Sequence, residues 1–153
     1  MKISAAGLEF IKEAEGLRQI AYQDSVGVWT IGYGHTRGVK AGDSCSKEQA
    51  EAWLCEDLES VYRDIDRFVH VPLTQGQFDA LCSFTFNLGG HALRDSTLLR
   101  LLNTKDYEGA EKQFSRWVHA GGQKLGGLIK RRAGEVEMFA STDPETTQPG
   151  GIA

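Results

Sequence analysis

Apolar side chains recur at helical spacing near the start of the chain. Ser4 is a suitable N-cap and Gly16 a suitable stop, so the pattern predicts a helix over residues 4–15. Glu15 follows Ile11 by four positions and therefore lies at the margin of the apolar side. A carboxylate in that place is an unusual choice for mere solubility. The apolar side consists of Leu8, Phe10, Ile11 and Ala14.

The spacing changes to alternation over residues 17–35, where turn residues interrupt short apolar runs. This pattern predicts a small antiparallel sheet with a tight turn near Gly27. A third short strand is expected to follow. It is predicted to be bent rather than flat because it carries glycines at positions 32, 34 and 38.

Helical spacing returns after Ser46. Ser46 and Gln49 form a capping-box pattern, S-x-x-Q, and apolar residues then continue at helical spacing toward Pro72. The pattern predicts one helix of about 23 residues, about 35 Å long. Its apolar stripe consists of Ala50, Trp53, Leu54, Leu58, Val61, Ile65 and Phe68.

The remainder of the chain predicts shorter helices. Thr74 and Gln77 form a second capping box, and the helix that they open is expected to end at Gly89-Gly90. Further helices are predicted at residues 96–103, 106–118 and 128–140, a glycine-rich loop at 120–127, and a flexible tail at 141–153.

The composition is that of a soluble globular protein and argues against several functions. The net charge of −4 over 153 residues provides no general attraction for nucleic acid or an anionic membrane. No apolar run has the length of a membrane-spanning helix and no signal-peptide pattern begins the chain, so we expect synthesis in the cytoplasm. Cys45, Cys55 and Cys82 lack metal-ligand spacing. Free thiols are expected, with a Cys45–Cys55 bridge formed after release as the alternative. We expect no metal and no cofactor.

Two carboxylates and a hydroxyl near the first turn suggest bond cleavage. Glu15 ends a helix, Asp24 stands in the turn, and Thr30 follows on a glycine-rich strand. Hydrolysis of a glycosidic bond needs an acid on one side of the bond and a carboxylate on the other. A Glu and an Asp nine positions apart also occur as a solvated helix end and a turn Asp that caps its own loop. Spacing alone leaves both interpretations open.

The longer string resembles the catalytic segment of the phage-type lysozymes (endolysins), glycoside hydrolase family 24. It consists of Glu15-Gly16-Leu17-Arg18, Tyr22-x-Asp24-x-x-Gly27 and Thr30-Ile31-Gly32-x-Gly34-His35. The resemblance extends more loosely to residues 72–89, 115–117 and 127–132, and covers about residues 4–140.

The resemblance implies hydrolysis of the β-1,4 bond between N-acetylmuramic acid and N-acetylglucosamine in peptidoglycan. It implies Glu15 as proton donor, Asp24 as base or stabilising carboxylate, and Thr30 as the residue that positions water. Because the family is considered inverting, the two carboxyl groups are expected to be about 6.5 to 9.5 Å apart.

Three further polar residues are candidates for supporting roles. Asp57 lies on the apolar stripe of the long helix, and the resemblance places His35 against that helix, so we predict that Asp57 pairs with His35. Arg132 lies on the apolar side of the last helix, and we predict that it, or failing that Arg131, contacts Glu15. The plain alternatives are an exposed His–Asp pair and a solvated basic helix face.

The resemblance also implies an architecture and a biological setting. We expect an α+β lysozyme-like fold, mostly helical, with one domain at 1–140. A small lobe at about 14–60 carries the sheet, a long helix connects, and a helical lobe at about 70–140 also receives residues 1–13. The enzyme is expected to be a monomer that waits in the bacterial cytoplasm. After a separate holin permeabilises the membrane, it acts on the wall in the periplasm, without stable membrane association.

Two rival functions remain open from the sequence. A lytic transglycosylase needs only the acid and releases 1,6-anhydro sugars, but it has no use for Asp24 and Thr30. A catalytically silent wall-binding module would pellet with uncleaved wall.

Overall fold

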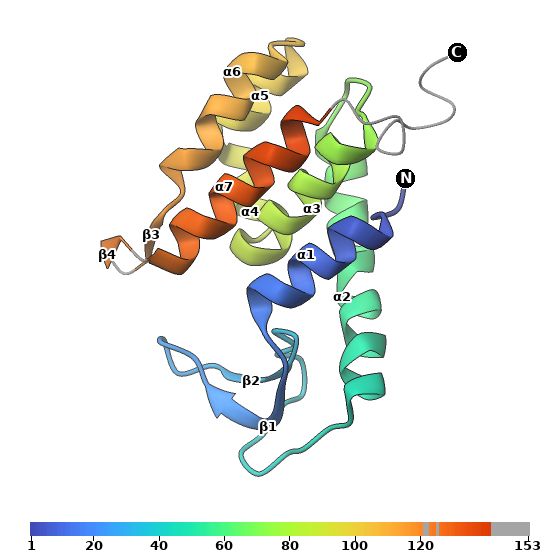
Figure 1. Cartoon of the computed structure of the whole chain (residues 1–153), viewed down its shortest axis with the longest axis vertical. Helices are drawn as coiled ribbons and strands as arrows, with labels where there is room; N and C mark the ends of the chain where they lie inside the picture. Colours follow the sequence, from blue (N-terminus) through green and yellow to red (C-terminus); the bar gives the residue numbers. More distant parts are fainter. Residues whose placement is uncertain (121–122, 125, 142–153) are drawn as a thin grey trace. The chain divides into compact units, whose positions relative to one another are not determined.

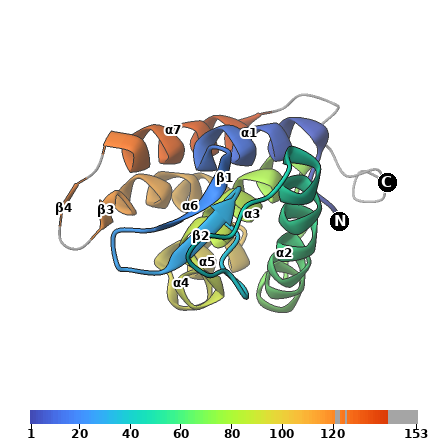
Figure 2. The same ribbon diagram turned by 90° about the horizontal axis from the view of Figure 1, so that it is seen from below.

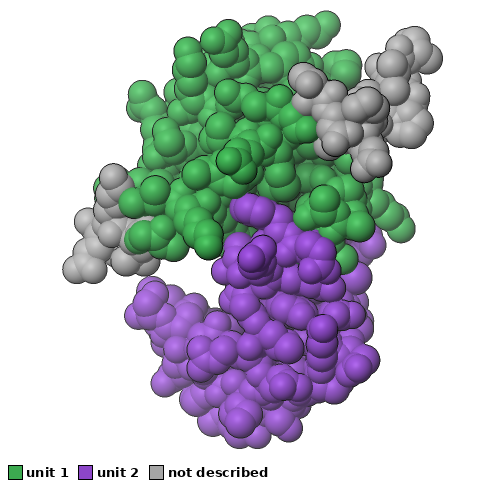
Figure 3. All heavy atoms as spheres, viewed as in Figure 1, with its two compact units in different colours: residues 1–8, 61–153 green, residues 9–60 purple. Residues whose placement is uncertain are grey.

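A computed structural model describes residues 1–120, 123–124 and 126–141 of the protein (Figure 1). The chain divides into two compact units (Figure 3). Residues 9–60 form the sheet unit, and residues 1–8 with 61–153 form the helical unit. The predicted α+β class, mostly helical with a short antiparallel sheet, is confirmed. The division into two lobes of one domain stays a prediction, and the predicted tail beyond Ser141 lies outside the described residues.

The sheet of the sheet unit has two antiparallel strands, β1 (Arg18–Gln23) and β2 (Trp29–Gly32). Tyr22 lies opposite Thr30, and Arg18 lies opposite Gly32, with an irregularity in the register between these pairs. The predicted turn joins the strands, and Gly27 within it adopts a φ of 89°. This hairpin carries two of the three predicted catalytic residues.

The predicted third strand does not form. Gly32 and Gly34 adopt φ values of 67° and 79°, which turn the chain back on itself. Ile31 and His35 therefore exchange a pair of backbone hydrogen bonds of 2.9 Å each, an isolated bridge rather than a strand. A second isolated bridge joins Ile20 to Ser44. Positive φ at alternate glycines breaks the extended backbone that a strand needs.

Helix α1 (Ala5–Glu15) ends where the sequence predicts. The N–H of Gly16 donates to the carbonyl of Lys12 at 2.8 Å, and Gly16 has a φ of 74°, a left-handed value that favours glycine. Ile11 is fully buried, but Ala14 is exposed, so the prediction that Ala14 belongs to the apolar side is wrong. The last turn of the helix is less buried than its middle, and Glu15 at its end is half-buried.

Helix α2 (Lys47–Phe68) is the predicted long helix. The Oγ of Ser46 accepts a hydrogen bond from the N–H of Gln49 at 3.0 Å, which satisfies one of the free donors at the helix start. The stripe of buried apolar residues is Ala50, Leu54, Leu58, Val61 and Ile65.

The helical unit contains α3 (Gln75–Leu88), α4 (Gly90–Asp95), α5 (Thr97–Asn103), α6 (Tyr107–Gln113) and α7 (Gly126–Ala140). The capping box of Thr74 and Gln77 is confirmed with both of its hydrogen bonds. Helix α3 packs against α7 and α4, and α5 packs against α6 (Figures 1 and 2). Phe84 and Phe114 meet edge to face with ring centroids 5.6 Å apart, and Phe139 packs on Phe114 at 5.3 Å.

Several boundaries in this unit differ from the predictions, and α7 begins two residues before its predicted start. Helix α4 begins at Gly90, where the sequence predicts only the end of α3, because Gly89 ends one helix and precedes the next. The helix predicted at 106–118 ends at Gln113 and continues as a 3-10 turn, Phe114–Arg116. At the predicted loop of residues 120–127, β3 (His119–Ala120) pairs with β4 (Gln123–Lys124).

Candidate active site

Asp24 stands in the turn between β1 and β2, and its side chain holds that turn. Its Oδ1 accepts hydrogen bonds from the N–H groups of Val26 at 3.0 Å and Val28 at 2.9 Å. The backbone N–H of Asp24 donates to the carbonyl of Val28 at 2.9 Å. One carboxylate oxygen therefore has the turn-capping role of the plain alternative, and it also fixes where the other oxygen, Oδ2, is presented on this exposed turn.

Thr30 lies on β2, and its side chain is 5% exposed. Its Oγ1 donates to the carbonyl of Val28 at 3.0 Å. This bond occupies the hydroxyl proton and leaves the oxygen lone pairs to accept. Asp24 and Thr30 thus both bond to the backbone of Val28, which links the two side chains through one residue.

Glu15 is the last residue of α1, in the same unit as Asp24 and Thr30. It is half-buried, and two residues, Gly16 and Leu17, separate it from the start of β1. The three predicted catalytic residues therefore lie in one unit, at the end of α1, in the turn and on β2. The predicted separation of the two carboxyl groups stays a prediction.

The structure brings the predicted pair His35 and Asp57 together. The Nδ1 of His35 and the Oδ2 of Asp57 are 2.8 Å apart, and His35 is only 7% exposed. Trp53, one helical turn before Asp57 on α2, stacks on the His35 ring with centroids 4.6 Å apart and planes within 7°. Arg37 adds an outer contact to the Oδ1 of Asp57 at 3.4 Å. This cluster attaches the end of the Ile31–His35 turn to α2, and that turn follows directly from Thr30.

We expect Asp57→Ala to lower the free energy of unfolding by about 1 to 3 kcal/mol, because the buried His35 nitrogen loses its partner. Glu56→Ala removes an exposed carboxylate from the same helix and is the matched control. Urea unfolding of both variants measures the difference. Equal losses in the two variants would show that the His35 contact stabilises nothing.

Arg132 lies on α7 in a buried polar cluster of the helical unit. Its Nη2 donates to the Oδ1 of Asn87 at 2.6 Å and to the Oε2 of Glu135 at 3.1 Å, and its Nε lies 2.8 Å from the Oε1 of Glu135. Arg132 is 1% exposed and Glu135 is fully buried. The predicted contact of Arg132 with Glu15 stays a prediction. The contacts seen make Arg132 part of the interior.

Two more side chains complete this buried cluster. The Oγ of Ser83, on α3, donates to the Oε2 of Glu135 at 2.6 Å and accepts from the Nε of Arg131 at 3.1 Å. The Nη2 of Arg131 also donates to the carbonyl of Ser83 at 3.3 Å. The cluster therefore joins α7 to α3 at the packed face of the two helices.

Burial raises the pKa of Glu135 to about 7, against the opposing effects of Arg132, of the Ser83 hydroxyl and of Arg131. The proton on Glu135 therefore stabilises the folded chain fully below the unfolded pKa of about 4.3, and this stabilisation is lost as the pH rises to about 7. We expect the unfolding free energy of the wild type, relative to Glu135→Gln, to fall between pH 5 and 7 and to level off above. Chemical unfolding across this range measures it. If the unfolding free energy of the wild type relative to Glu135→Gln rose with pH instead, the attraction of the two guanidinium groups for the carboxylate would outweigh the cost of burying it.

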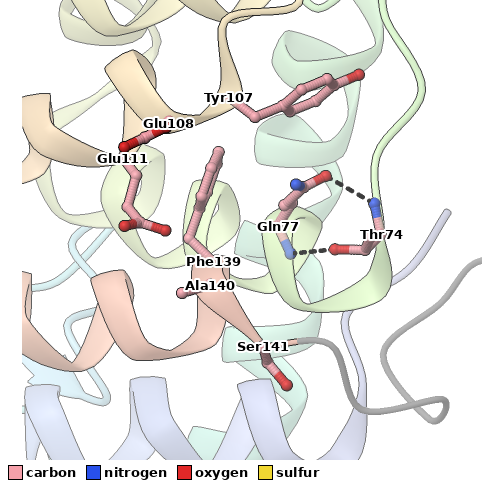
Figure 4. A pocket seen from close by; sticks show the side chains of 8 residues that line it. All are labelled: Thr74, Gln77, Tyr107, Glu108, Glu111, Phe139, Ala140 and Ser141. Atoms are coloured by element: carbon pink, nitrogen blue, oxygen red, sulfur yellow. Dashed lines mark hydrogen bonds between the residues drawn. The ribbon is translucent and has the colours of Figure 1, made fainter.

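An open pocket of about 400 Å³ lies elsewhere in the helical unit, between α6, the start of α3 and the end of α7 (Figure 4). Glu108 and Glu111 lie on one side of it, and the Phe139 ring lies between them and Gln77 (Figure 4). None of the predicted catalytic residues lines this pocket. Among the described residues, no group of His, Cys, Asp and Glu side chains could hold a metal ion. No helix of the described residues is long and apolar enough to cross a membrane.

A helix-end carboxylate, a second carboxylate fixed in a turn and a hydroxyl on the adjoining strand are the kinds of group that hydrolysis of a glycosidic bond uses. Comparison with known proteins agrees. The family model described as phage lysozyme matches residues 12–135. The chain belongs to the phage lysozyme family.

Individual relatives match over most of their length. The endolysin of Acyrthosiphon pisum secondary endosymbiont phage 1 is 49% identical over 145 residues, which are 92% of this chain and 99% of the relative. Among solved structures, the muramidase domain of SpmX from Asticaccaulis excentricus is 44% identical with a TM-score of 0.86, covering 92% of this chain and 98% of the other. A mutant of P22 lysozyme is 42% identical with a TM-score of 0.81, covering 92% and 99%.

Sequence reasoning missed Ser83, Asn87 and Glu135. A signal for Glu135 was present, because it follows Arg131 by four positions and Arg132 by three on a predicted helix, the spacing of side chains that meet. Ser83 and Asn87 lie on the apolar helix α3 and become partners only through its packing against α7. No local pattern indicates them.

Proposed function

We propose that this chain is an endolysin that hydrolyses the β-1,4 bond between N-acetylmuramic acid and N-acetylglucosamine in peptidoglycan. The observation that carries the proposal is the family match over residues 12–135, together with the intact segment from Glu15 to His35 within one unit. The similar P22 structure is a lysozyme and the similar SpmX structure a muramidase domain, activities of this chemical class.

We assign the chemistry of Asp24 to its Oδ2. Oδ1 already accepts two backbone N–H bonds, which fix the plane of the carboxylate. Oδ2 is then the oxygen that takes a proton from attacking water or stabilises the developing positive charge on the sugar. Thr30, like Asp24, is hydrogen-bonded to the backbone of Val28, and its hydroxyl oxygen offers lone pairs that orient the water.

Glu15 is proposed to protonate the leaving oxygen, as the general acid. With Asp24 and Thr30 acting on water, the reaction inverts the anomeric centre, and this outcome is part of the proposal. We also propose that Arg132, or failing that Arg131, supports Glu15 by contacting it. His35 and Asp57 are proposed to act only by holding the turn after Thr30.

We propose that the enzyme acts on the wall from the periplasmic side, as a monomer, after a holin permeabilises the membrane. No metal or cofactor takes part in the proposed reaction, and nucleic acid is not a partner. The net charge of −4 favours a substrate held by local contacts rather than by a general field.

The test is clearing of chloroform-treated Gram-negative cells by the wild type, Asp24→Asn and Thr30→Val. Asp43→Asn is a close control, because the Oδ2 of Asp43 caps a turn in the same unit by accepting from the N–H of Lys40 at 2.8 Å. We expect clearing by the wild type and the control, and at least about a hundredfold slower clearing by Asp24→Asn. Clearing by Asp24→Asn at the control rate would exclude the assigned role. Pelleting of the wild type with intact, uncleaved wall would favour a binding module.

A further inference from the structure

Arg18 and Tyr22 form a cation–π pair on β1 that the proposed chemistry does not use. The guanidinium carbon of Arg18 lies 4.2 Å from the centroid of the Tyr22 ring. Arg18 is exposed and Tyr22 is half-buried. Among the residues that the structure describes, no carboxylate lies within salt-bridge distance of this guanidinium. The ring holds the cation in place without neutralising its charge.

The register of the sheet places this pair beside the proposed catalytic residues. Tyr22 lies directly opposite Thr30, so their side chains project from the same face of the hairpin. Asp24 begins the turn directly after β1, two positions after Tyr22. The Arg18 cation is therefore fixed on the face of the hairpin that carries Thr30.

The exposure of Arg18 also leaves its N–H donors accessible to a ligand. A guanidinium presents these donors in a fork that fits a carboxylate with two hydrogen bonds. The long side chain is already held by the ring, so less rotamer freedom is lost on binding. The chain as a whole is acidic, with a net charge of −4, and repels an anionic substrate at long range.

We propose that Arg18, held by Tyr22, binds a carboxylate of the peptide attached to the substrate's muramic acid and so selects glycan strands that carry acidic peptides. This inference rests on the proposed function. It makes Arg18 a specificity-determining residue and Tyr22 its positioning residue. The alternative role for the pair is to stabilise the hairpin only.

The test uses soluble, uncross-linked glycan chains with stem peptides, and the same chains after their carboxylates are converted to amides with a carbodiimide and ammonia. We expect Arg18→Gln to raise KM about tenfold on the native chains with kcat nearly unchanged, the loss of one charge-assisted contact at an exposed site. On the amidated chains the wild type should show the same raised KM, and Arg18→Gln no further loss. Lys40→Gln makes the same charge change at an exposed position of the sheet unit and is the control.

Two further variants separate binding from hairpin stability. Arg18→Lys keeps the charge but not the fork and should lie between wild type and Arg18→Gln in KM. Tyr22→Leu frees the guanidinium and should raise KM on the native chains more than on the amidated chains. An equal loss by Arg18→Gln on both substrates, a loss in kcat alone, or no loss at all would overturn the proposal. If the wild type cleaves neither substrate, the proposed function fails first.

Discussion

Glu15→Gln is expected to lower the rate of wall hydrolysis by about a thousandfold while the protein remains folded. The amide group of glutamine has the size of the carboxyl group, but it cannot donate the proton that the leaving oxygen needs. Glu15 is half-buried at the last position of α1, where an amide fits the same space. Initial rates of reducing-end release from soluble glycan chains measure the loss, and thermal unfolding checks the fold.

Glu13→Gln is the matched control for this experiment. Glu13 lies two positions earlier on the same helix, it is exposed, and its replacement makes the same change of charge. The control should keep the wild-type rate. If Glu15→Gln kept more than about a tenth of that rate, Glu15 could not be the general acid, since such a group contributes about a hundredfold or more.

Glu135→Ala is expected to have the largest effect on stability, a loss of about 3 to 5 kcal/mol at pH 8. Glu135 is fully buried, and its carboxylate contacts Arg132 at 2.8 Å and the Ser83 hydroxyl at 2.6 Å. Removing it leaves a buried guanidinium with too few partners. For a domain of this size the melting temperature should fall by roughly 10 °C or more.

Glu137→Ala is the control, because Glu137 is exposed on the same helix and its loss changes the charge equally. A double variant, Arg132→Met with Glu135→Leu, should lose less stability than the sum of the single variants, since apolar groups of similar volume leave no charge unpaired. If the losses were additive, or if Glu135→Ala cost no more than Glu137→Ala, the cluster would not hold α7 to α3.

Elements with local signals could be predicted from the sequence. The start of α3 follows from the Thr74–Gln77 box, whose two hydrogen bonds close within one turn, and the end of α1 follows from Gly16. The candidate site was proposed from the resemblance of the whole Glu15–His35 string, because spacing alone leaves two interpretations open, and its catalytic roles stay a prediction. Asp57 and His35 were predicted as a pair because Asp57 lies on the apolar stripe and the resemblance placed His35 against that helix, and their contact is confirmed.

Features that depend on packing could not be predicted in this way. The prediction of a third strand was wrong because the positive φ angles at Gly32 and Gly34 turn the chain back, and the alternation of residues does not reveal these angles. The turn-capping and catalytic interpretations of Asp24 looked exclusive in sequence, whereas the two carboxylate oxygens allow both. The buried cluster around Glu135 required knowledge that α7 packs on α3.

The most direct test of hydrolysis is the mass of the sugars released in water labelled with oxygen-18. If Asp24 and Thr30 deliver water to the anomeric carbon, each new reducing end is N-acetylmuramic acid carrying one labelled oxygen. The account predicts this product from the wild type when the digest is analysed promptly. Unlabelled 1,6-anhydro ends would contradict it and would establish a transglycosylase in which the sugar's own hydroxyl attacks.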